Sequence, residues 1–163
     1  MRKIYIIGII IIAATLLVYS YITWPRHIQI ELKGIEYSQE DKNYSKKILI
    51  QIDGTMKKKL NGNRTFIGNF TLDNSTLAFA DEKFILSFDV TNSASLSVSY
   101  GEGLNDYGDM FANEDMSEIV IFTSTNKSED GHILAVPAED RETAENLALK
   151  YTNKEYEFYF KNN

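Results

Sequence analysis

The sequence has no cysteine and only two prolines in 163 residues. Without cysteine, the chain forms no disulfide bond, and it has no thiolate nucleophile, cysteine-based metal site or acylated lipobox. Small secreted animal domains usually contain disulfides, so an exported chain of this composition is more typical of a bacterial envelope.

Basic residues are outnumbered by acidic ones. The part of the chain from Arg26 onward contains 15 basic and 23 acidic residues, a net charge of −8. A nucleic-acid-binding protein needs a basic stripe that neutralises phosphates. The charge therefore argues against a nucleic-acid partner, although mild acidity of this size is also ordinary for a soluble domain.

Recognisable catalytic and cofactor signatures are missing as well. The sequence contains no G-x-S-x-G elbow, H-E-x-x-H pair, P-loop, G-x-G-x-x-G turn or EF-hand loop. Its two histidines, His27 and His132, lie 105 positions apart. Either could act as a general base if a carboxylate oriented it, but the sequence identifies no such partner and no nucleophile. No cofactor and no catalytic residue are predicted.

A long apolar run from Ile4 to Trp24 stands at the start of the chain. As a helix, its 21 residues would span about 31 Å, close to the roughly 30 Å hydrocarbon thickness of a bilayer. Tyr5 at one end and Trp24 at the other suit the aromatic belts of the two interfaces. We expect residues 4–24 to form a transmembrane helix with the lipid bilayer as its partner.

The basic start of the chain predicts the orientation of this helix. Arg2 and Lys3 favour residues 1–3 in the cytoplasm, so that residues 27–163 form an extracytoplasmic domain of a single-pass cell-membrane protein. A second interpretation is a signal peptide cleaved near Ser20, which would secrete the domain. A signal core is typically about 7 to 15 residues long, so the longer run here favours a retained anchor.

Alternation of apolar and polar residues dominates the remainder, with a polar loop at 37–44 and turns at Asp53-Gly54 and Asn61-Gly62. Three consecutive lysines, at 57–59, are typical of an edge strand, or of a basic patch with fewer charges than such patches usually have. Strands are predicted over residues 27–33, 47–53, 55–60, 66–72, 77–80, 84–90, 96–100, 118–123, 132–136 and 155–160.

Helical periodicity appears once. Ala144, Leu147, Ala148 and Tyr151 recur at helical spacing within residues 139–151, which predicts an amphipathic helix that covers one face of a sheet. Short strands separated by Gly, Asn and Asp predict a mainly β, β-rich α+β fold. We expect an antiparallel sandwich or partial barrel with this one C-terminal helix.

Acidic residues concentrate between Gly101 and Asp115, which the sequence predicts to be a long loop. Carboxylates are the hard oxygen ligands that calcium prefers, and a pair of them could also serve glycoside hydrolysis. A solvated loop explains the same composition, since loops of this length are often only mobile. The candidate calcium or ligand-binding residues are Glu102, Asp106, Asp109, Glu114 and Asp115.

Three groups of segments together resemble a known type of protein. They are 50–54 with 66–70, 108–111 with 119–121, and 133–138 ahead of the acidic helix. Together they resemble short, single-pass, uncharacterised membrane-anchored proteins of Gram-positive bacteria. The resemblance covers about residues 48–151, implies the cell envelope as compartment and brings no activity with it.

These observations predict a membrane-anchored extracytoplasmic binding or structural module of the cell envelope, with an envelope protein or glycan as its unidentified partner. The alternative is an envelope glycan or peptide hydrolase that uses acids of the 102–115 segment. The hydrolase predicts two carboxylates that converge within about 5 to 9.5 Å.

Overall fold

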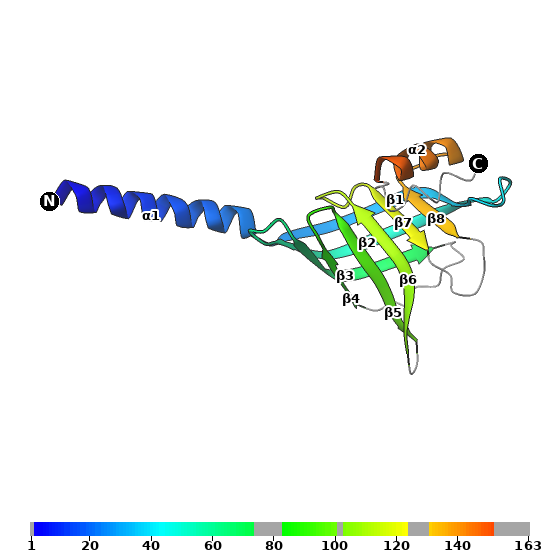
Figure 1. The fold of residues 1–163 in the computed structure, drawn as a ribbon, viewed down its shortest axis with the longest axis horizontal. Coiled ribbons are helices and arrows are strands. Elements are labelled where there is room, and N and C mark those ends of the chain that lie inside the picture. Colours follow the sequence, from blue (N-terminus) through cyan, green and yellow to red (C-terminus); the bar gives the residue numbers. More distant parts are fainter. Residues whose placement is uncertain (1, 74–82, 101–102, 124–130, 152–163) are drawn as a thin grey trace.

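A computed structural model describes residues 2–73, 83–100, 103–123 and 131–151 (Figure 1). Within these residues a long N-terminal helix precedes an eight-stranded antiparallel sheet and a short C-terminal helix, which confirms the predicted β-rich α+β class. In chain order the elements are α1 (Arg2–Thr23), β1 (Arg26–Ser38), β2 (Ser45–Lys58), β3 (Arg64–Asp73), β4 (Lys83–Phe88), β5 (Ser93–Tyr100), β6 (Gly103–Ala112), β7 (Ile119–Thr123), β8 (His132–Val136) and α2 (Arg141–Tyr151).

The sheet is a nearly closed barrel built from two meanders. Its strand order is β4-β3-β2-β1-β8-β7-β6-β5, so β1 and β8 join the N-terminal and C-terminal halves in the middle of the sheet. The two edge strands, β4 and β5, follow each other in the chain and are connected by a tight turn. In this turn Asn92 N donates to Asp89 O at 3.2 Å, and Asp89 N donates to Ser93 O at 3.0 Å.

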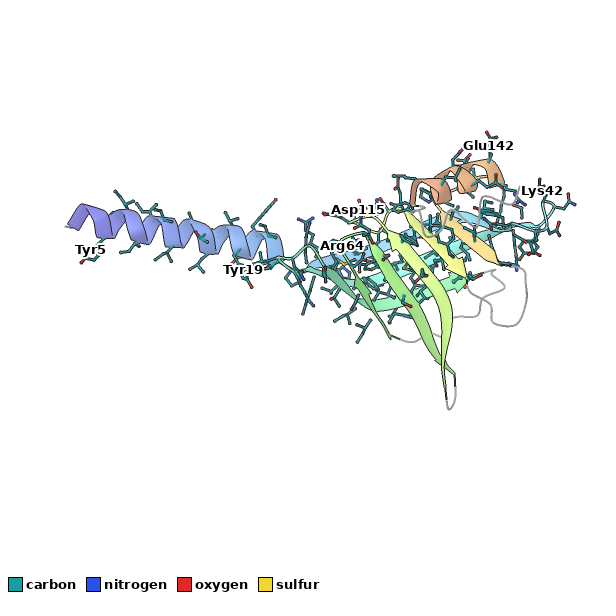
Figure 2. The ribbon with its side chains drawn as sticks, viewed as in Figure 1. Tyr5, Tyr19, Lys42, Arg64, Asp115 and Glu142 are labelled. Carbon is teal, nitrogen blue, oxygen red and sulfur yellow. The ribbon has the colours of Figure 1, made fainter. Side chains whose placement is uncertain are left out.

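The barrel has two ends. We call the end beside α1 the base; it is formed by the turns at 59–63, 89–92 and 113–118. The opposite, distal end carries the loop 39–44. Figure 2 shows Arg64 and Asp115 near α1 and Lys42 at the far end of the molecule.

The predicted hairpin at Asp53-Gly54 is wrong, because β2 runs through both residues. Gly54 instead pairs with Gly68 of β3, and the ring of Phe66 lies over the pair. A Cβ atom on Gly54 would lie 2.5 Å from Phe66 Cζ and 2.7 Å from Gly68 Cα. Gly54 therefore serves a close approach of two strands rather than a turn.

The true β2–β3 turn lies at Lys59–Asn63, which confirms the turn predicted at Asn61-Gly62. Gly62 has a φ of 89°, and Asn63 N donates to the side chain of Asn61 at 3.1 Å. The expected edge strand at 55–60 is wrong, since Lys57 and Lys58 belong to β2, an internal strand between β1 and β3. The predicted loop at 37–44 is also shorter, because β1 continues through Ser38.

Two apolar clusters hold the fold together. The first fills the barrel interior with inward-facing residues of all eight strands. The second lies outside the barrel, between α2 and strands β1, β6, β7 and β8, where Ala144 and Ala148 of the helix are fully buried. As a result, every residue of β7 is buried, as expected for a strand covered on both faces.

Helix α2 covers the sheet as predicted, but it begins at Arg141, two residues after the predicted start. Asp140 caps it, because its side chain accepts a hydrogen bond from Thr143 N at 2.8 Å. The Arg141 guanidinium reaches the distal loop, where it donates to Ser38 O and Lys42 O at 2.8 Å each. One side chain thus ties the helix to the loop between β1 and β2.

Two predicted elements lie outside the described residues. These are the strands at 77–80 and 155–160. Helix α1, by contrast, is described almost completely. Residues Tyr5–Thr23 have a mean hydropathy of 2.3, and none of this stretch is buried by the protein. The helix is long and apolar enough to span a membrane.

Candidate functional site

The described part of the predicted acidic loop at 101–115 is mostly a strand. Strand β6 occupies Gly103–Ala112, and among the described residues of this segment only 113–115 lie outside it, in the turn at 113–118. Glu102 lies outside the described residues, and of Asp106 the structure describes only the backbone, in β6. Gly103 and Gly108 belong to β6; Gly108, with a φ of 127°, stands near an irregularity in the β5–β6 pairing.

The other predicted acids have separate surroundings. Asp109 lies within β6. Glu114 accepts a hydrogen bond from Lys58 Nζ at 2.6 Å, and this contact lowers the pKa of Glu114. Asp115 closes its own turn by accepting from Ser117 N and Oγ, which lowers the pKa of Asp115. No group of three or more His, Asp or Glu side chains that could hold a metal ion occurs in the described ranges. The calcium and hydrolase hypotheses stay predictions, because they also involve Glu102 and the Asp106 side chain.

Buried polar residues mark the distal end of the barrel. Glu36 on β1 is fully buried, and its Oε1 lies 2.9 Å from His132 Nδ1 on β8. The same oxygen accepts a hydrogen bond from the Tyr44 hydroxyl at 3.0 Å, and the rings of Tyr44 and His132 meet edge-on at 4.8 Å. The His132 side chain keeps 20% of its surface exposed. This distal cluster is thus a buried carboxylate that holds a partly accessible imidazole.

The distal cluster has a definite chemistry. A carboxylate at Nδ1 favours the tautomer that is protonated there, so Nε2 is left to accept a hydrogen bond. The backbone of His132 is fixed as well, because its N donates to Thr123 Oγ1 at 3.0 Å and its O accepts from that hydroxyl at 2.9 Å. Such an imidazole can accept a hydrogen bond from a ligand at the distal end of the barrel, or accept a proton from that ligand.

Glu36 is not among the predicted site residues, because the first predicted strand ends at Lys33. The inward positions Ile28, Ile30, Leu32 and Gly34 continue with period two to Glu36. Extending this alternation past the glycine would have placed a carboxylate in the interior. It would have supplied the orienting partner that the sequence did not identify for His132.

The base of the barrel is closed by Arg64, which is 98% buried on β3. Its guanidinium donates to Asn113 O at 2.7 Å, to Asn92 Oδ1 at 2.8 Å and to Ala112 O at 2.9 Å, and it lies 4.9 Å from the ring centre of Phe88. Burial lowers the pKa of Arg64, and the nearby Glu114 carboxylate opposes this shift. Arg64 thus joins β3 to the β4–β5 and β6–β7 turns across the open side of the barrel.

A polar groove of about 530 Å³ lies on the outer face of β1, β2 and β3. Antiparallel register aligns its side chains in two rows across the strands. Gln51 Nε2 donates to Glu31 Oε2 at 3.1 Å, and His27 Nε2 lies 3.5 Å from Asp53 Oδ1. The polar lining residues are Gln29, Glu31, Gln51, Asp53, Asn69 and Thr71.

The groove offers carboxylates that accept hydrogen bonds and amides that both donate and accept. This set suits a ligand with many hydroxyl, amide or ammonium groups. Gln29 and Glu31 are polar positions of the strand predicted at 27–33, and both are exposed. The sequence did not predict that Asn69 and Thr71 extend the same rows two strands away, because that alignment depends on register between distant segments.

Comparison of the chain with protein-family models, with curated proteins and with solved structures finds no match. The resemblance to short membrane-anchored proteins of Gram-positive bacteria stays a prediction. Proposals about function therefore depend on the residues and geometry of this chain.

Proposed function

We propose that the chain is a single-pass, membrane-anchored binding module of the cell envelope, whose β-barrel lies outside the cytoplasm. The exposed apolar surface of α1 carries this proposal, since none of Tyr5–Thr23 is buried by the rest of the protein. Exposed apolar surface costs about 25 cal/mol per Å² in water, and a bilayer removes that cost. Arg2 and Lys3 at the free end of α1 support a cytoplasmic N-terminus.

The connection between α1 and the barrel supports the same arrangement. Only Trp24 and Pro25 separate the helix from β1, and β1 lies in the middle of the sheet. Strand pairing begins at Arg26, which faces Met56 of β2. The base of the barrel is therefore held at the membrane surface, while its walls and distal end face the envelope.

Charges placed in the middle of α1 are expected to abolish membrane retention. The double variant Ile10→Arg with Ile11→Arg adds two charges at the helix centre, at about 2.5–3.5 kcal/mol each on insertion scales. The parent chain, tagged at its C-terminus, should remain in the membrane pellet after alkaline extraction, and the double variant should not. Ile10→Leu with Ile11→Leu is the matched control and should behave as the parent.

Protease added to intact cells tests the orientation of the parent chain. Digestion should remove the C-terminal tag, because the barrel is expected outside. Parent protein that fractionates with the cytosol, or a tag that stays protected, would overturn the proposal. A mature product that begins after Ser20 would show instead that the leader is cleaved and the barrel secreted.

We further propose that the polar groove is the ligand-binding surface and that its ligand is a hydroxyl-rich envelope glycan. The groove lies on the barrel wall, and most of its polar side chains are exposed. Its mix of carboxylates and amides complements sugar hydroxyls, which both donate and accept. The Gln51–Glu31 and His27–Asp53 contacts hold some of these side chains in place.

Removing two central groove side chains is expected to weaken glycan binding at least tenfold. The variant Gln51→Ala with Asp53→Ala deletes one amide and one carboxylate, whose hydrogen bonds are worth about 2–4 kcal/mol together. Calorimetric titration of soluble cell-wall glycan fragments into the full chain in nanodiscs measures the effect. Ser87→Ala, on the outer face of β4 and outside the groove, is the control. Equal affinity of the parent and the double variant would contradict this site.

A further inference from the structure

The junction between α1 and the barrel holds a second, smaller cavity. It measures about 130 Å³, and its lining includes Tyr21 and Trp24 from the end of the anchor together with Arg26, Lys58 and Glu114 from the barrel base. Tyr21 and Trp24 are 76% and 71% exposed. Aromatic and basic side chains thus meet at the point where the chain leaves the helix.

The anchor fixes the depth of this cavity if α1 spans a bilayer, as proposed above. At most about 3.6 Å per residue separates Thr23 from Arg26, so Arg26 lies within about 11 Å of the helix end. The headgroup layer beyond the hydrocarbon core is about 5–8 Å thick on each side. Tyr21 and Trp24 suit that layer, since aromatic side chains gather at membrane interfaces. Arg26 and Lys58 would then lie at the level of lipid phosphates.

The fold brings four basic residues to the junction between α1 and the barrel base. Lys57, Lys58 and Lys59 form the end of β2 and the start of its turn, and Arg26 begins the neighbouring strand. The sequence showed only the three lysines, fewer than the about four to eight charges of typical polybasic lipid sites. Pairing of Arg26 with Met56 adds the fourth charge.

The acidic residues at the barrel base do not cancel the positive charge around this cavity. Glu114 accepts from Lys58, and Lys58, Arg64 and Arg26 all lower the pKa of Glu114. In the two neighbouring turns, Asp89 and Asp115 are bound within their own turns, and Glu118 accepts hydrogen bonds from Lys150 and Tyr151. Lys58, Arg64 and Arg26 therefore all act on the exposed Glu114 carboxylate. An anion is favoured at this position.

We infer that the cavity between α1 and the barrel base binds the phosphate headgroup of an anionic phospholipid. This inference rests on the proposed membrane anchor. Arg26 and Lys58 contact the phosphate, Lys57 and Lys59 add to the positive field, and Tyr21 and Trp24 pack against the glycerol and the upper acyl chains. The phosphate competes with Glu114 for Lys58.

Trp24 provides a fluorescence signal for lipid binding, because it is the one tryptophan in the sequence and it lines the cavity. The full chain in a neutral detergent is titrated with dioctanoyl phosphatidylglycerol while tryptophan emission is recorded. Parallel titrations use dioctanoyl phosphatidylcholine and inorganic phosphate. We expect a saturable emission shift with the anionic lipid and an affinity at least tenfold weaker for the other two. Equal affinity for phosphatidylcholine or for inorganic phosphate would overturn the inference.

Charge variants locate the site. Arg26→Gln with Lys58→Gln should weaken the anionic-lipid affinity about 25-fold, since each basic residue near a membrane contributes about fivefold. Glu114→Gln removes the competing carboxylate and should tighten the affinity about threefold. Lys33→Gln is the control, because Lys33 is exposed on β1 seven residues from Arg26, about 23 Å at the rise of a strand.

The outcomes separate this site from the anchor itself. An unchanged affinity in the double variant, an equal loss in Lys33→Gln, or a weaker affinity in Glu114→Gln would overturn the lipid site and leave α1 as an anchor. Fractionation of the parent chain with the cytosol would overturn the anchor, whatever the titration in detergent shows. Circular dichroism of each variant confirms that the barrel is folded before its affinity is compared.

Discussion

The Arg64→Met variant is expected to lose about 3–5 kcal/mol of unfolding free energy, because it removes one member of a buried charged network. Methionine keeps much of the volume of the side chain but donates no hydrogen bonds. Asn113 O, Ala112 O and Asn92 Oδ1 would each lose the guanidinium that now binds them at the base. Thermal unfolding of the full chain in detergent, followed by far-ultraviolet circular dichroism, measures the loss.

Two further variants show whether this effect belongs to the guanidinium. Arg64→Lys keeps a charge but not the planar fork that reaches two turns at once, so we expect an intermediate loss of about 2 kcal/mol. Lys33→Met removes an exposed cation from the barrel wall and should change the unfolding free energy by less than about 0.5 kcal/mol. Similar stability of Arg64→Met and the parent would show that the barrel base is closed without Arg64.

Gly68→Ala is expected to destabilise the barrel by about 3 kcal/mol or to prevent its folding, through overpacking of backbone against backbone. A Cβ atom there would lie 2.3 Å from Asp53 O and 2.4 Å from Gly54 Cα. Both atoms belong to the paired strand β2, which cannot shift without breaking its ladder. The yield of folded protein and its thermal midpoint report the result.

Two comparisons make the glycine prediction specific. Adding Phe66→Leu removes the ring that would lie 2.8 Å from the new Cβ, but the two backbone contacts stay, so this second change should not restore stability. Gly8→Ala is the control, because a Cβ on Gly8 meets nothing within 4 Å. A Gly68→Ala chain as stable as the control would mean that β2 and β3 separate easily at this point.

Periodicity in the sequence was sufficient to predict the class of the fold and the C-terminal helix. Ala144 and Ala148 were predicted from helical spacing, and both are buried against the sheet. In the strand predicted at 47–53, alternation puts Ile48, Ile50 and Ile52 on one face, and all three are in the barrel interior. These features depend on neighbours within a few residues, so the local sequence contains them.

Features that depend on distant pairing could not be predicted. Asp53-Gly54 has the composition of a turn, and only the presence of Gly68 across the ladder shows that it is a close strand contact. The segment that begins at Gly103 likewise has the composition of a loop, although it forms β6, which pairs on both sides. Burial of Arg64 follows from closure of the barrel, which no local window of sequence reveals.

Pairing of β1 with β8 affects the order in which contacts form as the chain folds. The second edge of β1 is covered between Ile35 and Ser38 only when β8 has been added, about 100 residues later in the sequence. A contact between such distant segments carries a large loop-closure cost and forms late. A polypeptide whose synthesis stops before β8 would therefore present an uncovered strand to other chains, and the addition of β8 is also the step that protects it from aggregation.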